Sequence, residues 1–243
     1  MSGAQRGDGS VSLLIEADLR RAILEGELAP GEAVRQEVWA KKFNVSRLPV
    51  RQALQRLEDE GLMTITPYAG ARVAVVALED CIALYEMREA IEPLVVARST
   101  SELTPEDLDE IREAMEAAEA VSHDSAAWLG ADREFHRQVN RHCSIPQALK
   151  LATQLYNQTQ QYRREYIRSV TAARIKLAEL EHRTIFAALE CGDAFEASER
   201  TRLHIRHTRL VLQSELSTSE DDVENPGLSF GGPSERLKRN RKK

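Results

Sequence analysis

Apolar residues along most of this chain recur every three to four positions, which is the period of one face of an α-helix. The pattern predicts three helices before residue 62 and six more between residues 78 and 214. Two short segments, residues 62–66 and 71–75, have strand-like content instead, with a turn signal at residues 67–70 between them. Because aromatic residues make up only 5% of the chain, we expect a mainly α protein with one β-hairpin.

The N-terminal part is organised around a predicted helix between Ser46 and Gly61. The Ser46 hydroxyl can cap the first turn, and Gly61 suits the left-handed conformation that ends a helix. One side of this helix is an apolar stripe of Val50, Ala53, Leu54 and Leu57. The opposite side consists of Arg47, Leu48, Arg51, Gln52 and Gln55. This polar side either contacts base edges in a DNA major groove or is the solvated face of an ordinary surface helix.

The segments that flank this helix favour the DNA-binding interpretation. A helix is predicted for residues 36–43, and Asn44 suits its C-terminal cap, so a tight turn joins two helices as in a helix-turn-helix. The hairpin that follows would be a wing. We therefore predict a winged helix-turn-helix domain over residues 10–77, preceded by a Gly-rich, disordered segment at residues 1–9.

Length and composition leave room for a second domain. The chain has 243 residues and a net charge of −6, but the acidic excess lies mostly beyond residue 78. The average charge therefore neither supports nor excludes binding to DNA. The three cysteines show no metal-ligand spacing, and the sequence contains no signal peptide and no apolar run that could cross a membrane. These features predict a cytoplasmic protein without membrane contact.

Residues 78–214 are predicted to form an all-α bundle of six helices. The segment from Thr104 to Asp107 is a strong helix start, with a capping residue, a proline and two acids. Gly192 and Asp193 mark a stop followed by a start, so the last two helices are expected to form an antiparallel hairpin. Residues 215–243 are polar with a basic end and are predicted to be a disordered tail, with added non-specific DNA affinity as the alternative.

Three histidines and one aspartate are placed so that they can converge within this bundle. Asp132 and His136 lie one turn apart on the same face of a helix. His182 lies about as far before the Gly192 bend as His204 lies after it, so both stand at the same level of the hairpin. Imidazole nitrogens and one carboxylate oxygen suit Zn²⁺, Ni²⁺, Mn²⁺ or Fe²⁺. The alternative is an ordinary core or surface histidine, which we expect for His123, His142 and His207.

The first domain resembles the DNA-binding domain of the GntR family of bacterial transcription regulators. The resemblance spans residues 30–76 and is most specific in the string VSRLPVRQALQRLEDEGL. It implies DNA contacts by Ser46, Arg47, Pro49, Arg51 and the wing-tip Gly70. Gln52 joins them because it lies on the same polar side of the helix. Glu37 stands where many members have Arg, and Arg35 is expected to supply that contact.

The second domain resembles the FCD effector domain of the FadR subgroup within that family. The matching strings are YEMREAIEP, ADREFH and LEHRTIFAALECGDAFEA, together with the late His204. The resemblance implies that Asp132, His136, His182 and His204 ligate a divalent metal ion. Six helices without an extra one are more similar to the VanR branch than to FadR itself. The segment HCSIP departs from the small Ser-Gly-Asn turn usual in the family.

Arg88 and Glu92 lie one turn apart on the first helix of the second domain. As a helix-surface ion pair they would contribute only about 0.3–0.5 kcal/mol. The family resemblance favours a second interpretation, in which Arg88 points into the cavity and binds the carboxylate of an effector through two hydrogen bonds. Tyr85, one turn earlier, could add a hydroxyl to this effector site.

Together these features predict a ligand-responsive transcription regulator, and regulators of this family are usually repressors. We expect no enzymatic activity and no catalytic residues. It would bind a near-palindromic double-stranded DNA operator as a homodimer. A small organic acid bound at the metal site would release it. Two alternatives are a metalloenzyme whose Asp-His₃ centre activates water and a pure metal sensor.

Overall fold

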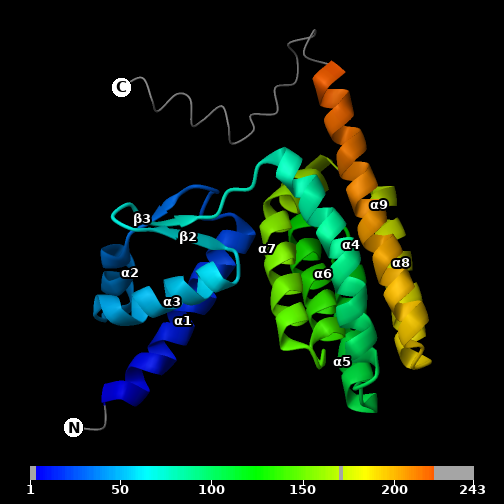
Figure 1. The fold of residues 1–243 in the computed structure, drawn as a ribbon, viewed down its shortest axis with the longest axis horizontal. Coiled ribbons are helices and arrows are strands. Elements are labelled where there is room, and N and C mark those ends of the chain that lie inside the picture. Colours follow the sequence, from blue (N-terminus) through cyan, green and yellow to red (C-terminus); the bar gives the residue numbers. More distant parts are fainter. Residues whose placement is uncertain (1–3, 170–171, 222–243) are drawn as a thin grey trace.

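The computed structural model describes residues 4–169 and 172–221, which form a small winged-helix domain beside a bundle of long helices (Figure 1). The first domain contains α1 (Ala4–Glu25), β1 (Ala33–Val34), α2 (Gln36–Phe43), α3 (Arg47–Asp59), β2 (Met63–Thr66) and β3 (Gly70–Val73). The second contains α4 (Leu78–Thr100), α5 (Pro105–Ala120), α6 (Ser125–Asn140), α7 (Pro146–Ser169), α8 (Ala172–Glu190) and α9 (Ala194–Asp221). The predicted mainly α fold with a winged helix-turn-helix and a six-helix bundle is confirmed.

The three strands pair antiparallel in the order β1–β3–β2. β2 and β3 are the predicted hairpin, and its register places Thr66 opposite Gly70. β1 is not predicted by the sequence pattern, because its two residues are too few to show an alternation. Ala33 pairs with Arg72, so β1 ties the loop before α2 to the wing.

The turn between α2 and α3 follows from the residues at its ends. Asn44 has a φ of 54°, the left-handed conformation that ends α2. Ser46 has the extended backbone of an N-cap, although its side chain makes no capping hydrogen bond. Gly61, with a φ of 73°, ends α3, and the Leu62 N–H donates to the oxygen of Leu57 (2.9 Å). The apolar stripe of α3 is buried against α1.

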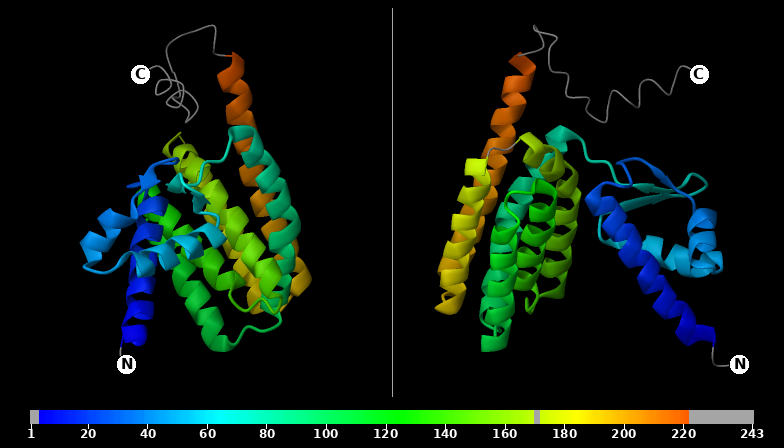
Figure 2. Two further views of the ribbon diagram at one scale, coloured as in Figure 1. Left: turned by 60° about the vertical axis from the view of Figure 1, so that its left-hand side comes forward. Right: turned by 180° about the vertical axis from the view of Figure 1, so that it is seen from behind.

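The six helices of the second domain run up and down along the bundle, with α4 in contact with both α7 and α9 (Figure 2). α8 and α9 form the predicted hairpin. Residues 4–9 belong to α1 and residues 215–221 to α9, so the prediction of disorder is wrong for these segments, while residues 1–3 and 222–243 lie outside the described residues. No helix in the described ranges is long and apolar enough to cross a lipid bilayer.

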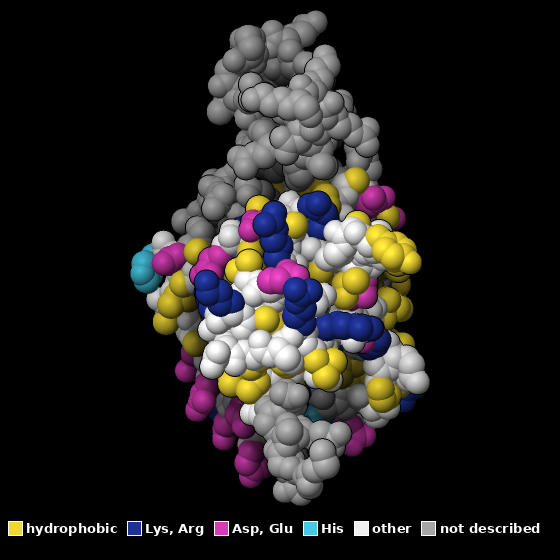
Figure 3. Space-filling model, turned by 90° about the vertical axis from the view of Figure 1, so that its left-hand side faces the viewer, with side chains coloured by type: hydrophobic (Ala, Val, Ile, Leu, Met, Phe, Trp, Pro, Cys, Tyr) yellow, Lys and Arg dark blue, Asp and Glu magenta, His cyan; other side chains and the backbone are white. Residues whose placement is uncertain are grey.

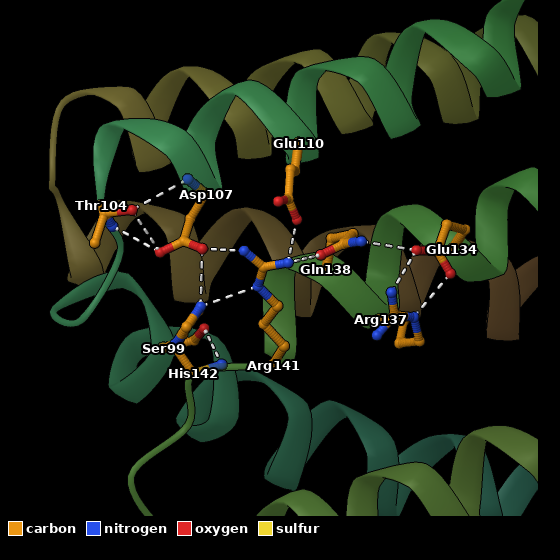
Figure 4. A network of polar contacts seen from close by, with 9 residues as sticks. All are labelled: Ser99, Thr104, Asp107, Glu110, Glu134, Arg137, Gln138, Arg141 and His142. Atoms are coloured by element: carbon orange, nitrogen blue, oxygen red, sulfur yellow. Dashed lines mark hydrogen bonds and ion pairs between the residues drawn. The ribbon is translucent and has the colours of Figure 1, made fainter.

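A polar network fastens the start of α5 to the end of α6 (Figure 4). Thr104 and Asp107 form a capping box, in which Asp107 Oδ2 accepts from the Thr104 N–H (2.9 Å) and Thr104 Oγ1 accepts from the Asp107 N–H (3.2 Å). The predicted helix start is thereby confirmed. Asp107 Oδ1 also accepts from Arg141 and lies 3.0 Å from His142 Nε2. The hydrogen bond from the Thr104 backbone is the main reason that the pKa of Asp107 is well below its usual range.

α7 is the bundle helix that lies against the winged-helix domain (Figures 1 and 2). Gln154 Nε2 donates to the backbone oxygen of Asp59 (2.5 Å), and Asn157 Nδ2 donates to that of Glu60 (3.0 Å). These carbonyls are at the C-terminal end of α3, where a helix has no partners of its own for them. Side chains of α7 therefore cap α3 and position it relative to the bundle.

Candidate metal centre and DNA-binding face

Asp132 and His136 of α6, His182 of α8 and His204 of α9 converge inside the bundle. One potential ligand atom of each residue lies within 4.8 Å of the others, and all four residues are buried. Asp132 Oδ1 is 3.5 Å from His182 Nε2 and 3.8 Å from His136 Nε2. The structure thus brings together all four residues that the sequence selects.

Two atoms of this centre, Asp132 Oδ1 and His182 Nε2, are buried without a hydrogen-bond partner in the described part of the chain. Buried polar atoms are rarely left in this state, because they lose their bonds to water without replacement. An oxygen and several nitrogens that face one another at more than hydrogen-bond distance are a suitable donor set for a divalent transition-metal ion. The residues present therefore fit such an ion.

The second oxygen of Asp132 is held by two side chains of α7. The Tyr156 hydroxyl donates to Asp132 Oδ2 (3.0 Å), and so does Arg163 Nη2 (2.5 Å). Burial alone would raise the pKa of Asp132, but the guanidinium of Arg163 and the neighbouring imidazoles outweigh it and hold that pKa well below its usual range. Asp132 is consequently ionised at neutral pH, with Oδ1 directed at the imidazoles.

The imidazoles of the centre are close together and deprived of water. The His182 ring centroid is 5.1 Å from that of His136 and 4.8 Å from that of His204. Burial is the main cause that lowers the pKa of His182 to about 3 and that of His136 well below its usual value. Both rings are therefore neutral at pH 7, which is the state in which imidazole binds metals.

Glu181 orients the ring of His204 from outside the centre. Glu181 Oε2 lies 2.7 Å from His204 Nδ1, and Oε1 is hydrogen-bonded to Nδ1 of His207. Because an ionised carboxylate only accepts hydrogen bonds, Nδ1 of His204 carries the proton and Nε2 is left as a lone-pair donor. Burial alone would raise the pKa of Glu181, but the hydrogen bond from His204 helps to lower it.

Sequence reasoning does not select Tyr156, Arg163 or Glu181. The first two recur at helical spacing with Thr159 on the inner face of α7, and such a polar stripe within a bundle helix is the signal that could have indicated them. Glu181 adjoins His182 in the sequence but contacts a different helix. Its role depends on the packing of α8 against α9, which periodicity does not specify.

Arg88 and Tyr85 lie beside the centre rather than in it. Arg88 is buried, donates to Glu92 (2.5 Å) and to Thr159 Oγ1 (3.0 Å), and lies between the rings of Tyr85 and Tyr156. The ion pair is thus internal and not a surface pair. Tyr85 is fully buried, and its hydroxyl has no hydrogen-bond partner within the described ranges.

An open pocket adjoins the centre on the side of α8 and α9. His204 and Arg163 are among its lining residues. The remaining lining residues come from α6, α8 and α9: Trp128, Leu129, Arg174, Ile175, Leu177, Ala178, Glu181, His207, Thr208 and Val211. Arg88 is absent from this lining, so Arg163 is the buried guanidinium that faces the pocket.

One face of the first domain points away from the bundle (Figures 1 and 3). Figure 3 shows Lys and Arg side chains spread over this face, with carboxylates among them. Arg35, Ser46, Arg47, Arg51 and the wing-tip Gly70 are exposed, and Gln52 is half-buried.

Two residues near the start of α3 differ from the expected set of exposed, positively charged DNA contacts. Pro49 is buried in the first turn, so its side chain is not on the exposed face with the others. Glu37 of α2 forms an ion pair with Arg47 (3.0 Å), both largely exposed. The carboxylate that replaces the usual arginine therefore reduces the positive charge at this end of the helix.

A winged helix-turn-helix joined to a helical bundle with a buried Asp–His cluster defines a two-domain DNA-binding regulator. Residues 12–73 match the family described as bacterial regulatory proteins, gntR family, and residues 83–207 match the FCD domain. The chain belongs to the gntR family of transcription regulators and carries an FCD domain as its second domain. The expected resemblance to both domains is thereby confirmed.

Known relatives support the same assignment along most of the chain. The chain is 29% identical over 188 residues to an uncharacterized HTH-type transcriptional regulator of Streptomyces ambofaciens, covering 77% of this chain and 79% of the relative. It is 23% identical to the HTH-type transcriptional repressor GlaR of Escherichia coli K12, and the match covers 82% of this chain and 94% of the relative. The fold is similar to that of Escherichia coli McbR/YncC, with a TM-score of 0.71 at 21% identity. This similarity covers 84% of the present chain and 98% of the McbR/YncC chain.

Proposed function

We propose that this regulator is a repressor whose operator affinity is controlled by a divalent metal ion and a small organic acid bound in the FCD domain. The observation that carries the proposal is the buried cluster of Asp132, His136, His182 and His204, with its two unpaired polar atoms. The relatives named above are transcription regulators, one of them a repressor, which favours regulation over the metalloenzyme alternative.

The four residues of the cluster would hold the ion, with Glu181 and Arg163 orienting His204 and Asp132. One carboxylate and neutral imidazoles suit Zn²⁺, Ni²⁺, Mn²⁺ or Fe²⁺. When bound, the ion would supply a positive charge and open positions for the oxygens of an acid. Arg163 faces the same pocket and adds a guanidinium for the acid. Arg88 acts indirectly, through its hydrogen bond to Thr159 of α7.

α7 connects this site to the DNA-binding domain. Its inner face holds Asp132 through Tyr156 and Arg163, and its outer face holds the end of α3 through Gln154 and Asn157. An acid in the pocket competes with Asp132 for Arg163, so the position of α7 depends on whether the pocket is filled. A shift of α7 changes how α3 is held, and the acid thereby favours a state with lower operator affinity.

The operator would be read by two copies of the first domain. One α3 per half-site, on a homodimer with a two-fold axis, suits a near-palindromic double-stranded sequence. Arg51 and Gln52 would contact base edges, and Arg35, Ser46, Arg47 and Gly70 would contact the backbone or a groove edge. All are at least partly exposed. Because its partner is operator DNA, the protein would act in the cytoplasm.

Fluorescence anisotropy on an operator selected from random duplexes tests the proposal. Zinc-loaded wild type should bind the operator and be released by one or more members of a panel of mono- and dicarboxylic acids. His182→Ala should bind the same DNA without any response to acid, since it lacks one ligand. His123→Ala, which changes an exposed histidine outside the cluster, should respond like wild type.

The outcomes separate the alternatives. An operator affinity that changes with zinc but not with any acid at fixed zinc indicates a pure metal sensor. An affinity that changes with neither contradicts the proposal.

A further inference from the structure

The pocket beside the metal centre runs along the bundle in one direction. Trp128 lies one helical turn before Asp132 on α6, and Ala178 lies one turn before His182 on α8. Arg174 lies a further turn along α8. Since the rise is about 1.5 Å per residue, the lining residues of α8, from Arg174 to Glu181, span roughly 10 Å along the helix. The lining is therefore longer than a single carboxylate group.

Most of the pocket wall between the centre and the mouth is apolar. The residues that form it are Leu129, Ile175, Leu177, Ala178 and Val211. Such a wall favours a hydrocarbon segment over a chain of hydroxyl groups, because hydroxyls would lose their bonds to water without replacement. The middle of the occupant is thus expected to be apolar.

Trp128 supplies a hydrogen-bond donor that the protein itself does not use. The residue is 3% exposed, and its indole Nε1–H has no acceptor in the described part of the chain. A buried N–H without an acceptor is rare in folded proteins and destabilising. Because Trp128 also lines the pocket, an acceptor on the occupant can satisfy this donor.

Arg174 adds a positive charge at the mouth of the pocket. Its side chain is exposed, and within the described ranges no carboxylate forms an ion pair with it. Glu181, the carboxylate in the pocket lining, is already hydrogen-bonded to His204 and His207. The outer part of the pocket therefore combines a neutral donor and a cation, which together favour an anionic acceptor such as a carboxylate.

We infer that the effector is a linear dicarboxylate, and that Trp128 and Arg174 are the residues that select it. One carboxylate lies at the centre, the hydrocarbon chain lies along the apolar wall, and the second carboxylate accepts hydrogen bonds from Trp128 and Arg174. This inference rests on the proposed function and narrows its class of organic acid. A monocarboxylate of equal length would leave the Trp128 donor unpaired and would bind more weakly.

Titration calorimetry with adipate and hexanoate tests the inference, because these acids share a carbon chain and differ in the second carboxylate. Zinc-loaded wild type should bind adipate about tenfold or more tightly than hexanoate, the difference expected for hydrogen bonds to a charged group. Trp128→Phe keeps an aromatic ring but removes the N–H, and Arg174→Gln removes the charge. Each should weaken adipate by about tenfold and leave hexanoate unchanged. Arg98→Gln, at an exposed position of α4, is the matched control and should change neither.

Zinc content measured on the same samples distinguishes a failure of the proposed function from a failure of the dicarboxylate inference. A wild-type protein that takes up no zinc contradicts the proposed function. If zinc is stoichiometric, the dicarboxylate inference is overturned by equal affinities for the two acids, by no binding of either acid, or by a Trp128→Phe protein that loses both equally. Arg174 is exposed, so its variant gives an answer even if replacement of the buried Trp128 disturbs folding.

Discussion

Replacing Glu181 with Gln is a sensitive test of the metal centre, because it alters a residue that touches a proposed ligand without being one. Glu181 Oε2 accepts a hydrogen bond from His204 Nδ1 at 2.7 Å. A carboxylate in this position fixes the ring and its proton and increases the basicity of the other nitrogen. The Gln amide has nearly the same size and can still accept this bond, but it lacks the charge.

The expected effect follows from that role. Loss of such a partner typically weakens metal binding by about 10–100-fold, which corresponds to about 1.4–2.7 kcal/mol. The fold itself should change little, since Glu181 is only half-buried and lies outside the apolar clusters of the bundle. Zinc affinity should therefore fall while the melting temperature of the metal-free protein stays close to that of wild type.

Competition with a zinc-chelating dye at fixed pH measures the affinity, and thermal unfolding with chelator present measures the metal-free stability. Glu116→Gln, at an exposed position of α5, removes the same charge away from the centre and is the control. A Glu181→Gln protein with wild-type zinc affinity would refute the reasoning. An equal loss in Glu116→Gln would show that net charge, and not the hydrogen bond to His204, sets the affinity.

Four further predictions follow from other parts of the molecule. Arg51→Ala should weaken operator binding by about 1–3 kcal/mol and relax the preference at one base pair, as measured by anisotropy on single-base operator variants. Asn157→Ala removes one cap of α3, so it should reduce the release of DNA by acid while zinc binding, measured with the dye, stays unchanged. Asp107→Asn should destabilise the protein by about 1–2 kcal/mol in urea unfolding at pH 7. Because the pKa of Asp107 is lowered in the folded state, this difference should persist above about pH 4, the usual range of a free Asp, and shrink as the pH falls below it. Sedimentation at micromolar concentration should give the mass of two chains, and a mass near one chain would contradict the homodimer.

Several features of the fold could be predicted because they depend on neighbours in the sequence. The capping box at Thr104 and Asp107 and the left-handed Asn44 are set by the conformational preferences of a few adjacent residues. β1 could not be predicted in this way, since two residues acquire a strand conformation only by pairing with β3. The helical residues 4–9 were also missed, because the glycines there suggest disorder more strongly than helix.

The same distinction applies to the candidate site, where some residues could be predicted from their spacing in the sequence and others could not. The sequence predicts that His182 and His204 lie side by side in the α8–α9 hairpin, because each is about the same number of residues from the Gly192 bend. In the structure the centroids of the two rings are 4.8 Å apart. Arg163 could not be placed, since its contact with Asp132 depends on how α7 packs against α6. Arg88 and Glu92 have the spacing of a surface pair, and only the packing of α4 against α7 and α9 reveals that they are buried.

The central claim is that Asp132, His136, His182 and His204 together hold one metal ion, and elemental analysis of purified protein tests it most directly. Wild type incubated with Zn²⁺, Ni²⁺ and Mn²⁺ and then desalted should retain one ion per chain, while His182→Ala and His204→Ala should each lose it. A wild-type protein that remains metal-free, or a His182→Ala protein that keeps a full complement, would contradict the account.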